Sequence, residues 1–124
     1  MLKFRLAAAA AFSLAFVSPA AAQPAAQTVY VWSFSFAPKP IHLQAGAPVT
    51  LTFVNRSGSS HDFTAKGFFA RARILSGNVE NGEVDLGPHQ TRVVTLVPAA
   101  GSYHAHCSHF LHRQLGMDDM IVVN

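Results

Sequence analysis

Three residues able to bind a soft metal ion recur at intervals of five near the C-terminal end, namely Cys107, His112 and Met117. They offer a thiolate, an imidazole and a thioether. Two imidazoles and a thiolate in a trigonal plane, with a weak axial thioether, form the ligand set of a blue-copper centre. The second imidazole must come from elsewhere, and His61 fits because it opens a predicted strand directly after a polar loop. The pattern predicts one mononuclear copper ion, with these four residues as its candidate ligands.

Other residues compete for the same roles. Met120 is an alternative to Met117 as axial ligand, and His109 lies closer in sequence to the cysteine than His112 does. Cys107 is the only cysteine and cannot form an intramolecular disulfide. Its ordinary alternative role is that of a small buried hydrophobic residue.

The chain contains seven histidines, more than one copper site needs. On a strand, His104 and His106 share the face opposite to Cys107. They are expected either to form a polar outer face or to bind a second metal ion weakly at the surface. His42, inside a predicted strand, and His89, in a predicted turn, are interpreted as surface residues.

The elements that must position the ligands are short strands. Alternation of apolar and polar residues, interrupted by Gly/Pro turns, predicts strands over 28–36, 41–44, 49–54, 61–65, 83–86, 91–97, 102–107 and 118–123. Residues 68–76 fit a short helix or an irregular loop. This pattern predicts an all-β sandwich or small barrel. A strand ending at Cys107, followed by a loop back into the last strand, directs the C-terminal candidates toward one centre.

The N-terminal segment has the layout of a secretory signal peptide. A short basic start precedes the apolar run 6–17, and small residues with an Ala-x-Ala cleavage site follow before Gln23. The apolar run is shorter than the ~20 residues of a membrane-spanning helix. We therefore expect residues 1–22 to be a signal peptide, 23–27 a short flexible lead and 28–124 one folded domain, exported to the periplasm without stable membrane anchoring.

Charge and motifs exclude several function classes. The formal net charge is +3, and two of the basic residues, Lys3 and Arg5, belong to the export segment. The remaining basic residues are scattered, which does not favour nucleic-acid binding. The sequence contains no phosphate loop, dinucleotide-binding turn or Gly-x-Ser-x-Gly motif.

Two stretches resemble the two halves of a small bacterial cupredoxin of the plastocyanin and azurin type. The first comprises Phe34-x-Phe36-x-Pro38, Ile41, Gly46, Val49-Thr-Leu-Thr-Phe-Val-Asn55 and His61-x-Phe63. The second is Gly101-x-Tyr103-x3-Cys107-x4-His112-x3-Gly116-Met117-x3-Ile121-Val-Val. The resemblance spans nearly all of the predicted domain, with residues 66–82 matching least, and it implies a cupredoxin-like Greek-key β-sandwich.

The resemblance also implies roles for particular residues. It assigns the copper ligands to His61, Cys107, His112 and Met117. It places Asp62, where many relatives have asparagine, in a position to tie the two ligand loops together through backbone or hydroxyl groups around Ser108. Multicopper oxidases read His-Cys-His at the cysteine, whereas this chain has serine after Cys107. Oxidase chemistry is therefore not expected.

These features together favour one-electron transfer to a redox partner protein, without enzymatic conversion of a substrate. Copper buffering, delivery or resistance, with a copper donor or acceptor protein as partner, is the alternative that the surplus histidines suggest. Phe110, Leu111 and Leu115 are expected around the exposed edge of His112, either as loop packing or as an apolar docking patch. The domain is expected to be a monomer.

Overall fold

The computed structural model describes residues 1–4, 7–18, 23–109 and 116–124. Its elements in chain order are β1 (Ala25–Trp32), β2 (Ser35–Ala37), β3 (Ile41–Leu43), β4 (Val49–Asn55), β5 (His61–Thr64), α1 (Lys66–Arg71), β6 (Arg73–Ser76), β7 (Glu83–Leu86), β8 (Thr91–Val97), β9 (Gly101–His106) and β10 (Asp118–Val123). The segment 68–76, which the sequence left open, therefore contains the end of a short helix and a strand.

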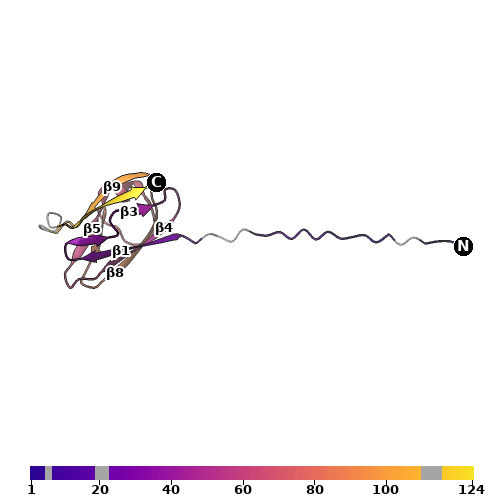
Figure 1. The fold of residues 1–124 in the computed structure, drawn as a ribbon, viewed down its shortest axis with the longest axis horizontal. Coiled ribbons are helices and arrows are strands. Elements are labelled where there is room, and N and C mark those ends of the chain that lie inside the picture. Colours follow the sequence, from indigo (N-terminus) through magenta and orange to yellow (C-terminus); the bar gives the residue numbers. More distant parts are fainter. Residues whose placement is uncertain (5–6, 19–22, 110–115) are drawn as a thin grey trace.

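The strands form two five-stranded sheets that face each other (Figure 1). One sheet has the order β2-β1-β4-β8-β6 and the other β3-β10-β9-β5-β7. β1 pairs in parallel with β4, and β10 in parallel with β3, while the other strand pairs are antiparallel. Neighbouring strands are mostly not consecutive in sequence, as in a Greek-key sandwich. The predicted all-β architecture is confirmed.

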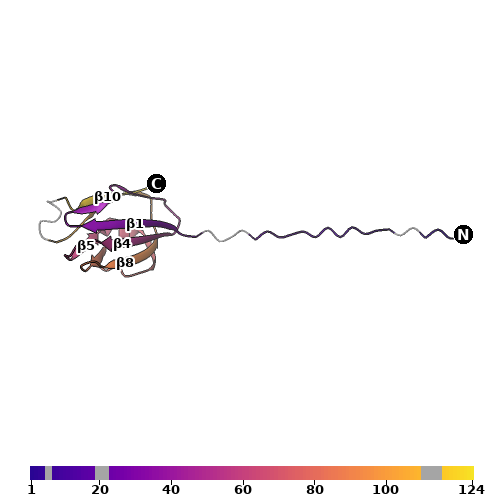
Figure 2. The same cartoon turned by 60° about the horizontal axis from the view of Figure 1, so that its bottom comes forward.

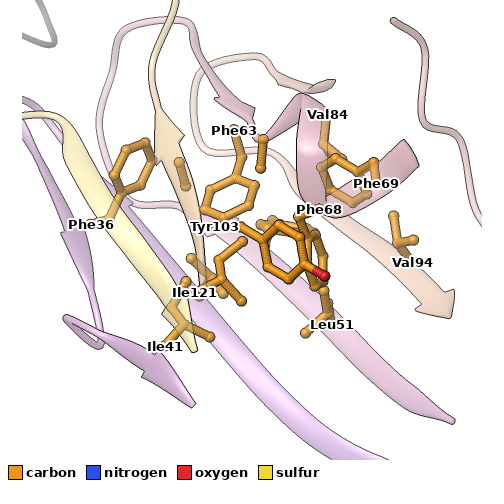
Figure 3. Packing of buried hydrophobic residues seen from close by; sticks show 14 of the residues in the cluster. Phe36, Ile41, Leu51, Phe63, Phe68, Phe69, Val84, Val94, Tyr103 and Ile121 are labelled. Carbon is orange, nitrogen blue, oxygen red and sulfur yellow. The ribbon is translucent and has the colours of Figure 1, made fainter. Parts of the chain in front are cut away.

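The core lies between the inner faces of the two sheets. Phe53 and Phe63 are fully buried at its centre, with ring centroids 4.9 Å apart. Figure 3 shows Tyr103 beside Phe68 of α1, with ring centroids 5.6 Å apart. The ring centroid of Phe69, also in α1, lies 6.3 Å from that of Phe63, so the helix adds its apolar face to the same core. The Tyr103 hydroxyl donates to the carbonyl of Ala99 at 2.8 Å. This contact fixes the turn that leads into β9, the strand that ends at the cysteine.

The first predicted strand is divided in two. β1 ends at Trp32, which pairs with Ser35 at the start of β2, and Phe34 takes a φ of 67° in the turn between them. β1 also begins at Ala25, where Ala25 pairs with Val49. Residues 25–27 of the expected flexible lead therefore belong to the sheet, because backbone pairing with β4 continues beyond the alternating part of the sequence.

The described residues before β1 lie outside the two sheets and extend away from them (Figures 1 and 2). They have no regular secondary structure. Within the described ranges, no helix is both long and apolar enough to span a lipid bilayer.

Candidate metal centre

Three neighbouring strands, β10, β9 and β5, have termini at the same end of the β3-β10-β9-β5-β7 sheet. β9 ends at His106, which pairs with Asp118 at the start of β10. β9 is antiparallel to β5 and its last residue, His106, is opposite Thr64, so the chain after β9 continues alongside β5 toward His61. Cys107, Met117 and His61 occupy these three ends. This end of the sheet is the end of the sandwich away from the N-terminal stretch (Figure 1).

Cys107 and His61 lie together although 46 residues separate them in sequence. The Cys107 Sγ atom is 3.9 Å from the His61 Nδ1 atom, and the two residues are 1% and 2% exposed. Metal–sulfur and metal–nitrogen bonds of about 2.3 and 2.0 Å, as zinc makes, place the two donor atoms about 3.7 Å apart at a trigonal angle. The observed separation therefore suits two ligands of a single ion.

Met117 is the methionine on the interior side. It is fully buried, whereas Met120 is 39% exposed. The Met117 carbonyl accepts a hydrogen bond from the Cys107 backbone N–H at 3.1 Å. Gly116 precedes it with a φ of 102°, and a Cβ atom there would lie 3.0 Å from the Phe34 carbonyl oxygen. A side chain at position 116 would crowd the Phe34 carbonyl, which explains the glycine before Met117. Burial favours Met117 over Met120 as the thioether candidate.

The fourth predicted ligand, His112, lies outside the described residues. His109, the alternative at this position, lies close to the other candidates. Its Nε2 atom is 3.6 Å from Asp62 Oδ2, and its ring centroid is 6.3 Å from that of His61. The possible ligand atoms of Asp62, Cys107 and His109 all lie within 4.8 Å of one another. His109 therefore remains a candidate beside His112.

Asp62, in β5, binds the segment that follows β9. The prediction that Asp62 ties the two ligand loops together is confirmed. Its Oδ1 atom accepts hydrogen bonds from the Ser108 backbone N–H at 2.8 Å and from the Thr64 hydroxyl at 2.7 Å. Its Oδ2 atom accepts from the Ser108 hydroxyl. Asp62 itself is 2% exposed. Because it follows His61 and binds the residue after Cys107, it fixes the two candidate ligands relative to each other.

Asn55 holds the loop that precedes His61, a role that the sequence interpretation missed. Its Nδ2 group donates to the carbonyls of Ser59 at 2.8 Å and Gly87 at 2.9 Å. Its Oδ1 atom accepts from the Ser57 backbone N–H at 3.0 Å and from the Ser57 hydroxyl at 2.9 Å. The side chain is 1% exposed. The available signals were the position of Asn55 at the end of an alternating strand and its place in the motif that resembles cupredoxins.

We expect Asn55→Ala to lower the free energy of unfolding by about 2–3 kcal/mol, because buried carbonyl and N–H groups lose their partners. Chemical denaturation of the metal-free protein measures this. The matched control is Asn78→Ala at an exposed position, which should change stability by less than about 0.5 kcal/mol. Equal losses in the two variants would show that Asn55 does not anchor this loop.

The surroundings of the sulfur disfavour a bare thiolate. Burial raises the pKa of the Cys107 thiol, and the negative charges of Asp62 and Glu83 act in the same direction, while the backbone N–H groups of Asp62 and His109 partly oppose it. Burial also raises the pKa of Glu83, with Asp62 and Asp85 contributing. A cation beside the sulfur would offset the cost of forming the thiolate, because metal ligation requires the deprotonated form.

The donor set fits copper. A thiolate and a buried thioether select soft ions, and imidazole suits copper as well as zinc. His61, Cys107 and Met117 would hold the ion, and either His112 or His109 would complete the set. Carboxylate ligands, which hard cations require, are limited to Asp62 among the residues close to Cys107 that the structure describes. That carboxylate already accepts hydrogen bonds from Ser108 and Thr64.

His104 and His106 lie on the outer face, as their parity predicts. Along β9, Tyr103 and Ala105 are buried, His104 is exposed and His106 is half-buried. The two imidazole centroids are 5.9 Å apart. These histidines therefore lie on the opposite side of the strand from Cys107 and belong to a different surface of the molecule.

Solved structures with the same architecture include both small and large copper proteins. The auracyanin of the photosynthetic bacterium Roseiflexus castenholzii matches with a TM-score of 0.62 and 18% identity, over 83% of this chain and 99% of that one. Auracyanin A, a "blue" copper protein from Chloroflexus aurantiacus, matches with a TM-score of 0.55 and 21% identity, over 80% and 99%. A multicopper oxidase from Campylobacter jejuni matches with a TM-score of 0.63 and 11% identity, over 86% of this chain and 31% of the oxidase.

At these identities the structural matches establish the fold alone. This chain spans less than a third of the length of the oxidase. No curated protein matches the chain in sequence. The model of the cupredoxin-like domain family, however, matches residues 5–122, and copper is the metal that the buried sulfur and imidazole donors fit. The chain therefore belongs to the cupredoxin-like domain family.

Proposed function

We propose that this protein is a one-electron carrier with a single type 1 copper centre, and that it is not an enzyme. The observation that carries the proposal is the approach of the Cys107 sulfur to His61 Nδ1 in a buried position. When bound, copper supplies a one-electron redox couple. The candidate ligands are His61, Cys107 and Met117, with His112 or His109 as the fourth.

The protein's part is to hold the donor atoms in place and to exclude water. His61 begins a strand, Cys107 follows one and Met117 precedes one, so each ligand is fixed by a paired backbone. The Asp62–Ser108 contacts bind two of these segments to each other. Ligands that move little between oxidation states favour rapid electron transfer. The paired strand ends and the Asp62 contacts therefore suit an electron carrier.

A second candidate function is copper handling, that is, buffering or delivery to an acceptor protein. The outward pair His104 and His106 favours it, because surface imidazoles could bind metal that the buried centre does not hold. An electron carrier should instead retain the copper ion of the buried centre and cycle it reversibly between two oxidation states.

Voltammetry of the protein loaded with one equivalent of copper separates the two functions. We expect a reversible one-electron wave, with the metal retained when a copper chelator of moderate affinity is added. Loss of the metal on reduction, or transfer of the copper to the chelator without a reversible wave, would contradict electron carriage and favour copper handling.

The proposed location is the periplasm, supported by the basic start, the apolar run and the Ala-x-Ala site of residues 1–22. The partner would be a redox protein that docks near the copper end. N-terminal sequencing of the protein recovered from its host tests the location. A chain beginning at Gln23 supports export, and one that retains Met1 contradicts it.

A further inference from the structure

Four possible metal ligands face outward on two paired strands, away from the buried centre. His106 of β9 is opposite Asp118 of β10, and His104 is opposite Met120. Side chains directly opposite in an antiparallel pair have Cβ atoms about 4.5–5.5 Å apart. Alternate residues of one strand share a face. The four side chains therefore share one patch on the outer surface of the sheet, although in this structure the possible ligand atoms of His104, His106 and Asp118 do not all lie within 4.8 Å of one another.

Each member of this group is accessible or partly so. His104 is exposed and His106 half-buried, and Met120 is 39% exposed. The Asp118 side chain is 41% exposed and forms an ion pair with Lys39 at 3.2 Å. A shallow hollow on the surface is lined in part by Lys39, Asp118 and Met120. An ion from solvent can therefore reach the donors of β10 without opening the fold.

The chemistry of the group selects for copper. Imidazole binds late first-row ions, and among the divalent ions Cu(II) has the highest affinity for a given site. The Asp118 carboxylate supplies negative charge and also forms the ion pair with Lys39. The Met120 thioether adds a soft donor, of the kind that binds Cu(I). Two imidazoles, a carboxylate and a thioether thus form a donor set different from that of the buried centre, because it contains no thiolate.

We propose that His104 and His106, together with Asp118 and Met120, form a second copper site on the outer face of β9 and β10. The site does not depend on the proposed electron-transfer function, because it shares no ligand with the buried centre. It is linked to that centre along the backbone, where His106 directly precedes Cys107. It would bind an ion reversibly at the surface, in the accessible setting that uptake or exchange of copper requires.

The test is a titration of the copper-loaded protein with further Cu(II). Equilibrium dialysis counts the bound ions, and electron paramagnetic resonance distinguishes nitrogen-ligated Cu(II) without a thiolate from the first centre. We expect a second equivalent to bind to the wild type. We expect the double variant His104→Gln/His106→Gln to bind it more than about tenfold more weakly, since loss of even an outer contact costs metal affinity 10–100-fold.

The matched control is His42→Gln, which removes an exposed histidine from β3 of the same sheet. This variant should keep the second equivalent. Repeating the double substitution in a Cys107→Ser background should again remove one equivalent, which separates this site from the thiolate centre. The proposal is overturned if the wild type binds only one ion, if the double variant keeps the second, or if His42→Gln loses it as fully as the double variant does.

Discussion

Replacing Cys107 with serine is expected to abolish the intense visible absorption of the copper-loaded protein. That absorption arises from charge transfer between a thiolate and Cu(II), and Cys107 is the only cysteine of the chain. The buried Cys107 Sγ atom, 3.9 Å from His61 Nδ1, is replaced by a hydroxyl that is a much weaker ligand. We also expect Cu(II) affinity to fall more than about tenfold, because direct ligands matter at least as much as their outer contacts.

The matched control is Ala105→Ser, which introduces a hydroxyl at a fully buried position of β9, the strand that directly precedes Cys107. This variant should lose some stability, because it buries a new polar group, but should keep the absorption of the copper-loaded form. Visible spectroscopy during copper titration measures both variants. A Cys107→Ser protein that retains the band would show that the sulfur is not a copper ligand.

Replacing Asp62 with alanine is expected to weaken copper binding by about 10–100-fold, the usual cost of losing a contact that orients metal ligands. The carboxylate of Asp62 accepts from the Ser108 backbone N–H at 2.8 Å and from the Thr64 hydroxyl at 2.7 Å. Without it, the residues after Cys107 lose their attachment to the strand that begins at His61. Competition with a chelator of known affinity measures the effect.

Two further variants give this experiment its specificity. Asp62→Asn can still accept the Ser108 N–H, so we expect it to bind copper within a few-fold of the wild type. Asp85 is directly opposite Asp62 on β7 and is exposed, so Asp85→Ala removes a similar charge without touching the ligand loops and should leave affinity unchanged. If Asp62→Ala binds copper as tightly as Asp85→Ala does, the orienting role of Asp62 is wrong.

The sequence alone predicted the strands whose alternation is regular. Val49–Asn55 and Thr91–Val97 have the expected period of two, and the structure places them side by side as β4 and β8. The prediction of one continuous strand over 28–36 was wrong because the turn that divides it contains no glycine. Phe34 adopts a φ of 67°, which aromatic residues rarely take. The alternation therefore continued across the hairpin without a break.

At the candidate centre, prediction succeeded where the resemblance named a contact. Cys107 and Met117 lie within one hairpin, and the Asp62–Ser108 contact was expected from the resemblance and is present. Prediction failed for Asn55, because neither the residue pattern nor the resemblance assigned it a partner such as the Gly87 carbonyl, 32 residues away. Without such an assignment, a single sequence does not show which distant loops a side chain bridges. The assignment of His112 stays a prediction, with His109 as its rival.

A crystal structure of the protein loaded with one equivalent of copper, with the metal located by anomalous scattering at the copper edge, tests the central claim most directly. We predict one strong peak about 2.0–2.3 Å from both Cys107 Sγ and His61 Nδ1, with His112 or His109 as the third strong ligand and Met117 on the axial side. A copper ion bound without the Cys107 sulfur, for example between His109 and Asp62 alone, would contradict the account.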